Sequence, residues 1–134
     1  MDTVTRKRRS YVMSCVRSKN SVPELAVRRL LHRLGFRFRL HQTNLPGTPD
    51  IVLTRHRVVV FVHGCFWHRH PGCPNTRTPK SRVTFWRKKF EANIERDRIA
   101  RSRLRRAGWR VLVVWECQSK KSGLASRVKR FMER

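Results

Sequence analysis

Two apolar segments separated by a long helical segment constrain the fold of this chain most strongly. Val58 to Val62 and Trp109 to Trp115 are apolar runs of strand length, and a helical pattern from Thr84 to Ala107, ended by Gly108, lies between them. A strand, a long helix and a second strand form a crossover unit whose two strands run parallel. The C-terminal ends of both strands should therefore lie at one edge of a sheet. The apolar side of the helix is marked by Phe85, Trp86, Phe90, Ile94 and Leu104.

A short hairpin is predicted immediately before this unit. The apolar run Ile51 to Leu53 is joined to the first strand by a polar turn that we expect to be centred near His56. With that centre, antiparallel pairing places Asp50 opposite Val62 and beside His63. A carboxylate at the start of one strand thus meets the loop that leaves the next strand.

Two further helices and one further strand complete the predicted elements. A helix begins near Pro23, which is favoured at the first helical position, with Ser21 as its cap, and Gly35 ends it. Apolar and basic residues alternate from Phe36 to Leu40, which predicts a half-buried strand. Ser126 to Arg134 has the length of a short terminal helix. We expect an α/β fold with a central mixed β-sheet flanked by helices.

The balance of charge identifies the class of partner. The chain carries 33 Lys and Arg residues against 8 Asp and Glu residues, a formal net charge of +25 on 134 residues. Positively charged side chains at this density repel one another unless a polyanion or counterions lie nearby, so nucleic acid is the expected partner. A membrane surface is the alternative, but the sequence has no apolar run of about 18 residues and no apolar segment behind its basic N-terminus. We therefore expect a cytoplasmic, monomeric protein that binds no membrane.

The basic residues at the N-terminus divide the chain into an arm and a domain. Residues 1–20 have little apolar periodicity, and their basic members are Arg6, Lys7, Arg8, Arg9, Arg17 and Lys19. We predict a DNA-contacting arm over residues 1–20 and a single domain over residues 21–134. Lys88, Lys89 and Arg96 of the long helix would bind phosphates, which sets affinity without reading sequence.

Three cysteines and one histidine have the spacing of a metal site. Cys65, His70 and Cys73 follow a C-x4-H-x2-C pattern, and the parallel strands bring Cys117 to the same sheet edge. Disulfides are unlikely to form in a reducing compartment, and these four ligands match a tetrahedral structural zinc site. His68 is an alternative to His70 as the nitrogen ligand. The alternative to zinc is a set of buried free cysteines with a surface histidine.

A second set of residues has the chemistry for phosphodiester hydrolysis, which needs an activated water molecule and neutralisation of charge at phosphorus. Asp50 could bind Mg2+ with the Val62 carbonyl as a second protein ligand. His68 or His63 could transfer protons near neutral pH. Glu24 could orient a water molecule on the metal. From the residues alone, the ordinary explanations are a turn residue for Asp50 and a favourable helix start for Glu24.

The adjacent aromatic residues Phe66 and Trp67 lie in what we interpret as an exposed loop. Such a pair could insert between base pairs, where unstacking costs least at a mismatch. The alternative is that both residues belong to an ordinary core. We assign Trp86, Trp109 and Trp115 to the core, because they lie on periodic elements.

Five motifs, in one order over nearly the whole chain, closely resemble the very-short-patch repair (Vsr) mismatch endonuclease family. They are LPGTPD at Leu45 to Asp50, VFVHGCFWH at Val60 to His68, Phe85-Trp86, NIERDR at Asn93 to Arg98, and GWRVLVVWEC at Gly108 to Cys117. The resemblance implies a restriction-endonuclease-like fold, a structural zinc and Mg2+-dependent nicking 5′ of the thymine in a T:G mismatch. It further implies that nicking starts repair of deaminated 5-methylcytosine, with MutL and a companion cytosine methyltransferase as associated proteins.

The same resemblance assigns roles in catalysis. It implies that Asp50 binds the catalytic metal, that His68 is the catalytic histidine, and that His63 and Glu24 support them. Relatives often carry Thr where this chain has Val62, and because the family uses the backbone carbonyl there, Val62 should still serve.

The resemblance also assigns roles in zinc and DNA binding. It implies that Cys65, His70, Cys73 and Cys117 are the zinc ligands. It further implies that Phe66 and Trp67 intercalate beside the T:G pair while Met13 enters from the other groove. Two alternatives are a non-catalytic zinc-stabilised nucleic-acid-binding module and a nuclease of the same fold without mismatch preference.

Overall fold

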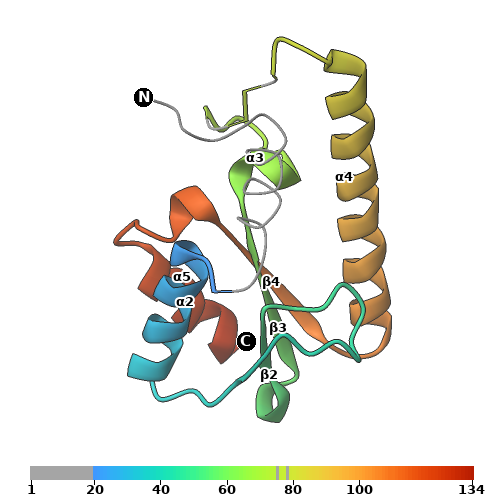
Figure 1. Ribbon diagram of the computed structural model, residues 1–134. Coiled ribbons are helices and arrows are strands. Elements are labelled where there is room, and N and C mark those ends of the chain that lie inside the picture. The colour runs from blue at the N-terminus through green and yellow to red at the C-terminus, as the bar shows by residue number, and fades with distance from the viewer. Residues whose placement is uncertain (1–19, 75, 78) are drawn as a thin grey trace.

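The computed structural model describes residues 20–74, 76–77 and 79–134 (Figure 1). The elements are, in order, α2 (Val22–Arg33), β1 (Arg39–Leu40), β2 (Ile51–Leu53), η1 (Thr54–His56), β3 (Val58–His63), α3 (Cys65–His68), α4 (Val83–Arg106), β4 (Arg110–Trp115), η2 (Glu116–Gln118) and α5 (Leu124–Glu133). The predicted basic arm, apart from Asn20, and Met13 within it lie outside the described residues. Among the described residues, no helix is both long enough and apolar enough to span a bilayer.

The sheet has the order β1-β2-β3-β4 and is mixed. β1, β2 and β3 pair antiparallel, and β3 pairs with β4 in parallel. His63 and Trp115, the last residues of β3 and β4, are register partners. The predicted crossover unit is therefore confirmed, and the segments that follow β3 and β4 leave the sheet at the same edge.

The hairpin between β2 and β3 is present, but its predicted register is wrong by one residue. Ile51 pairs with Val60, and the turn consists of η1 followed by Arg57 in the left-handed conformation with φ of 56°. The centre of this turn lies before His56 rather than on it, because all four connecting residues belong to the turn. The Asp50 side chain nevertheless contacts the backbone of Val62, as described below.

Helices cover both faces of the sheet (Figure 1). Alternate residues of β3 point to opposite faces. One face packs with α2 and α5, and its buried residues are Val27, Leu31, Ile51, Leu53, Val58, Val60, Leu112, Val114, Leu124, Val128 and Met132. The other face packs with α4, and its buried residues are Val52, Val59, Phe61, Leu104 and Trp109. The predicted α/β architecture with a helix-flanked mixed sheet is confirmed.

The helix ends follow the predicted signals, whereas the strand from Phe36 to Leu40 is shorter than expected. Ser21 caps α2, and Gly35 follows its end with φ of 89°. Exposure alternates from Phe36 as predicted, but only β1 at Arg39–Leu40 pairs with the sheet. The neighbouring β2 is only three residues long, so it offers few partners.

The predicted apolar side of α4 is partly wrong. Phe85 and Ile94 are 44% and 46% exposed, while Asn93 and Ala100 are buried. α4 has 24 residues, and its N-terminal part extends beyond the sheet to contact α3 instead. One apolar side along a whole helix is expected only when the helix packs against a single surface. α4 packs against two, the sheet and α3.

Of the three tryptophans assigned to the core, only Trp109 is fully buried. Trp86 and Trp115 are half-buried. Trp86 lies at the N-terminal end of α4, beyond the sheet, and Trp115 lies at the sheet edge where β4 ends. Both positions leave part of the ring outside the main core.

Candidate metal and catalytic sites

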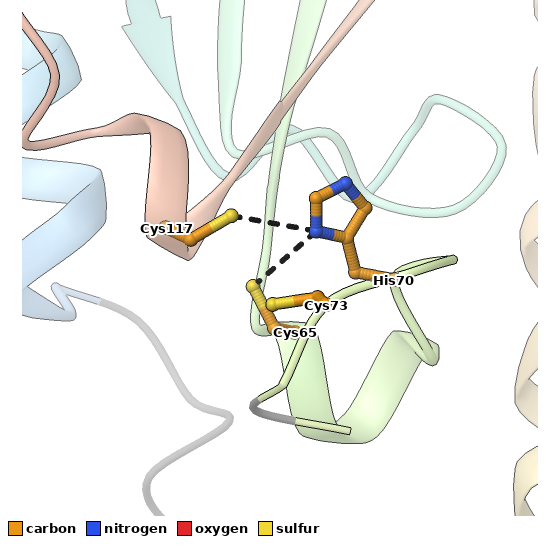
Figure 2. Close-up of side chains that lie close together, drawn as sticks. All are labelled: Cys65, His70, Cys73 and Cys117. Atoms are coloured by element: carbon orange, nitrogen blue, oxygen red, sulfur yellow. Dashed lines mark hydrogen bonds between the residues drawn. The ribbon is translucent and has the colours of Figure 1, made fainter.

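Three cysteines and one histidine come together where the ends of β3 and β4 meet (Figure 2). Cys65 begins α3 after β3, His70 and Cys73 follow α3, and Cys117 lies in η2 after β4. Their ligating atoms all lie within 4.8 Å of one another. The Nδ1 of His70 lies 3.8 Å from the Sγ of Cys65 and 3.4 Å from the Sγ of Cys117. These separations bracket the about 3.6 Å that sulfur and nitrogen ligands span across a tetrahedral zinc ion.

The Cys65 thiol of this group would ionise at neutral pH only with a metal ion bound to it. Burial, with the neighbouring thiols, raises the pKa of Cys65 to about 12. A thiol with this pKa stays protonated at neutral pH, and the charge of a bound metal ion would convert it to the thiolate. His68, the alternative nitrogen ligand, is not in this group, because its Nδ1 bonds to Asp97. The four residues therefore fit a metal ion such as Zn2+, with His70 as the nitrogen ligand.

Two carboxylates, the buried Glu24 and the half-buried Asp50, lie close together beside β3. The N–H of Glu24 donates to the Oγ of the cap residue Ser21 at 3.3 Å, which fixes the first turn of α2, and its side chain is only 2% exposed. The Oδ2 of Asp50 accepts a 2.7 Å hydrogen bond from the N–H of Val62. Burial, with the charge of Glu24, raises the pKa of Asp50 to about 7 in spite of this hydrogen bond. Two acids in such contact form a site that a cation would stabilise.

Glu24 has two further partners. Arg28, one turn later on α2, forms a salt bridge with its Oε2. The Nε2 of His41 lies 3.1 Å from its Oε1 and 3.0 Å from its Oε2. Glu24, His41 and Asp50 form a second group whose ligating atoms lie within 4.8 Å of one another. Sequence reasoning missed His41, because a lone histidine after a short strand resembles any other loop residue.

A third group consists of His63, His68 and Asp97. The Nδ1 of His68 lies 2.5 Å from the Oδ2 of Asp97, and the rings of His63 and His68 stack with their centroids 3.9 Å apart. Burial, with the nearby His68, lowers the pKa of His63 to about 3, so this ring is neutral at neutral pH. Burial would raise the pKa of Asp97, but the hydrogen bond and charge of His68 hold it below its ordinary value. The group combines an ionised carboxylate with two stacked imidazoles.

Asp97 is the second functional candidate that sequence reasoning missed. It lies on α4 one turn after Asn93, whose Nδ2 donates a 3.3 Å hydrogen bond to the Trp67 carbonyl. Both side chains therefore face α3. Polar residues four apart on one side of an otherwise basic helix were the available signal, since such residues lie next to each other on the helix surface.

Phe66 and Trp67 do not lie in an exposed loop, so that expectation was wrong. Both belong to the short helix α3, and Trp67 is only 7% exposed. The ring of Phe66 lies 5.9 Å from that of Trp86 and 5.2 Å from that of Phe90 on α4, centroid to centroid. The guanidinium of Arg69 lies 4.1 Å from the Phe90 ring centroid. The aromatic pair therefore forms the packing between α3 and α4, and only Phe66 is partly exposed.

Known proteins similar to this chain are named as an endonuclease or as nicking enzymes. Residues 1–75 match the family model described as DNA mismatch endonuclease Vsr. The type II nicking enzyme V.XorIIP of Xanthomonas oryzae pv. oryzae is 51% identical over 98% of this chain and 97% of its own length. The DNA mismatch endonuclease Vsr of Escherichia coli is 44% identical over 81% of this chain and 69% of its own length. The type II nicking enzyme V.NmeAIP of Neisseria meningitidis is 42% identical over 92% and 87%, respectively.

Proposed function

The chain belongs to the DNA mismatch endonuclease Vsr family and is a DNA-cleaving hydrolase, and from this premise we propose that it nicks one strand immediately 5′ of the thymine in a T:G mismatch. The nick would start very-short-patch repair of deaminated 5-methylcytosine. The substrate is double-stranded DNA, and the chain acts as a cytoplasmic monomer, with MutL as a further partner. The name of the Escherichia coli relative supports mismatch specificity.

The pair of the half-buried Asp50 and the buried Glu24 is the observation that carries this proposal. Arg28 compensates Glu24, but burial and Glu24 still disfavour the ionised form of Asp50, which a further cation would stabilise. Asp50 would hold Mg2+ together with the Val62 carbonyl, and Glu24 would orient a water molecule beside it. The N–H of Val62 already bonds Asp50, and in an extended strand the carbonyl of a residue points to the same side as its N–H. Bound Mg2+ would supply charge stabilisation at the phosphate.

His68 is the group that we assign to proton transfer. Asp97 accepts a hydrogen bond from Nδ1, which fixes the ring and leaves Nε2 with the free lone pair. Burial keeps the stacked His63 neutral, so His63 does not repel the protonated form of His68. His63 therefore supports the ring of His68 rather than exchanging protons itself.

The zinc site and the aromatic cluster serve DNA binding in this proposal. Zn2+ on Cys65, His70, Cys73 and Cys117 would hold both ends of the segment that contains α3. Phe66 and Trp67 would insert beside the mismatch, and Met13 of the N-terminal arm would enter from the other groove. Basic residues along α4 would bind phosphates. The zinc is thus a scaffold, distinct from the catalytic metal.

A nicking assay on matched duplexes tests the proposal. Zinc-loaded protein with Mg2+ should nick a T:G duplex and leave the C:G duplex intact, and mapping should place the cut 5′ of the thymine. Asp50→Ala and His68→Ala should abolish nicking while the T:G duplex is still bound. Equal cleavage of both duplexes would favour a nuclease without mismatch preference. Binding without cleavage in Mg2+ or Mn2+ would favour a nucleic-acid-binding module, which has no use for the Asp50 and Glu24 pair.

A further inference from the structure

The backbone of His41 is held in an unusual conformation next to Asp50. His41 follows β1 with φ of 46°, in the left-handed region that residues other than glycine rarely adopt. Its N–H donates a 3.1 Å hydrogen bond to the Asp50 carbonyl. Backbone strain of this kind persists only where the surroundings fix it, often at functional sites. A backbone hydrogen bond thus joins the strained residue to the residue that carries the candidate metal-binding carboxylate.

The side chain of His41 points into the carboxylate pair. It is 11% exposed, and its Nε2 lies 3.1 Å and 3.0 Å from the two oxygens of Glu24. Adjacent ligands of an octahedral ion with bonds of about 2.1 Å are separated by about 3.0 Å. The nitrogen of His41 therefore stands at ligand spacing from Glu24, within the same group as Asp50.

We propose that His41 is a direct ligand of the catalytic divalent metal and that its nitrogen shifts the preference of the site from Mg2+ towards Mn2+. Glu24 would then bind this metal directly, beside Asp50, instead of orienting a water molecule on it. This proposal rests on the proposed function and deepens it by naming a residue that sets metal choice. Arg28 already pairs with Glu24, so Glu24 does not need a protonated His41 as its counterion. In the metal-free protein Nε2 donates its hydrogen to Glu24, and a bound metal ion would replace this hydrogen at Nε2.

The preference follows from the chemistry of the donor set. Mg2+ prefers oxygen ligands and strict octahedral geometry, whereas an imidazole nitrogen suits transition-metal ions better. A site with only Asp50, Glu24 and backbone carbonyls would offer oxygen alone. Adding one nitrogen should strengthen Mn2+ binding more than Mg2+ binding.

Electron paramagnetic resonance of bound Mn2+ tests the proposal without depending on activity. Zinc-loaded full-length protein is titrated with Mn2+, and electron spin echo modulation then reports nitrogen bonded to the ion. Wild-type protein should show modulation from a directly coordinated nitrogen, and His41→Gln should lose it. Mn2+ affinity should fall about tenfold in His41→Gln, while Mg2+ affinity, measured by competition, changes less than about threefold. His32→Gln, an exposed histidine on α2, is the matched control and should retain the modulation and both affinities.

The outcomes separate this inference from the proposed function. Mn2+ that binds in an Asp50-dependent manner without nitrogen modulation would overturn the role of His41 while leaving the metal site intact. Modulation that persists in His41→Gln would assign the nitrogen to another histidine and would also overturn it. Loss of Asp50-dependent Mn2+ binding altogether would instead contradict the proposed catalytic site. The modulation in wild-type protein is measured without any substitution, so the test stands even if His41→Gln folds poorly.

Discussion

The N–H of Val62 donates a 2.7 Å hydrogen bond to the Oδ2 of Asp50. This bond fixes the carboxylate against the end of β3, at the point where the chain turns into α3. It also lowers the pKa of Asp50, but burial raises that pKa more, with the charge of Glu24 adding to the increase, and the result is about 7. Ionisation of the Asp50 carboxylate is therefore unfavourable in this site unless a cation binds beside it.

This balance predicts how the metal-free protein responds to pH. The pKa of Asp50 rises from 3.8 to about 7 on folding, so between these values the folded state holds a proton that the unfolded chain has released. The contribution of Asp50 to the free energy of unfolding should therefore fall as pH rises from about 4 to about 7, by about 3 kcal/mol. His63, whose pKa is lowered to about 3 by burial, contributes in the opposite direction, so the contribution of Asp50 is the difference between the wild type and a variant that lacks this carboxylate. Thermal melts of zinc-loaded protein in Mg2+-free buffer across this range measure the change.

Asp50→Asn supplies the control for this prediction. The amide does not titrate, and its oxygen can still accept from Val62, so the variant should lose this part of the pH dependence. At pH 8 without Mg2+ it should be more stable than the wild type, and adding Mg2+ should stabilise only the wild type. An identical dependence of stability on pH in both proteins would show that Asp50 is not the titrating group.

The metal group at the ends of β3 and β4 predicts that metal loss and activity loss occur together. Cys117→Ser should bind less than one zinc per chain, and its melting temperature and its nicking rate should both fall, because the metal holds the segment that carries His68. Zinc content by atomic emission, together with melting and nicking, measures the three effects. Cys15→Ser, which removes the one cysteine of the sequence that is not among the four assigned ligands, should keep its zinc. Full zinc content in Cys117→Ser would contradict the four-ligand site.

The bond between His68 and Asp97 predicts a catalytic defect without a binding defect. Asp97→Asn removes the charge that fixes the Nδ1 proton, so the single-turnover nicking rate should fall by about 10- to 1000-fold. Affinity for the T:G duplex should change less than about threefold, because the side chain lies beside the histidine rather than on a basic surface. Glu95→Gln, an exposed position on the same helix that pairs with Arg98, should leave both values unchanged. A normal nicking rate in Asp97→Asn would remove Asp97 from the mechanism.

The parts of the structure that could be predicted from sequence are those set by local pattern and strand topology. The apolar runs and the helix between them specify the parallel unit, and that unit brings Cys117 to Cys65. Asp97 and His41 escaped prediction because their roles depend on contacts between elements far apart in the chain. The predicted register of the hairpin was wrong by one residue, because the geometry of the turn around His56, and not the apolar pattern, decides which residues pair.

The packing of α3 on α4 predicts different effects for the two aromatic residues assigned to DNA insertion. Trp67 is 7% exposed, so Trp67→Ala should lower the free energy of unfolding by about 3 kcal/mol. It should also lower the nicking rate. Phe66 is partly exposed, so Phe66→Ala should cost less stability and act mainly on DNA, with the preference for T:G over C:G duplex binding falling about tenfold. Thermal melts and paired binding titrations separate the two effects. Unchanged mismatch preference in a stable Phe66→Ala protein would mean that the pair serves the packing between the helices alone.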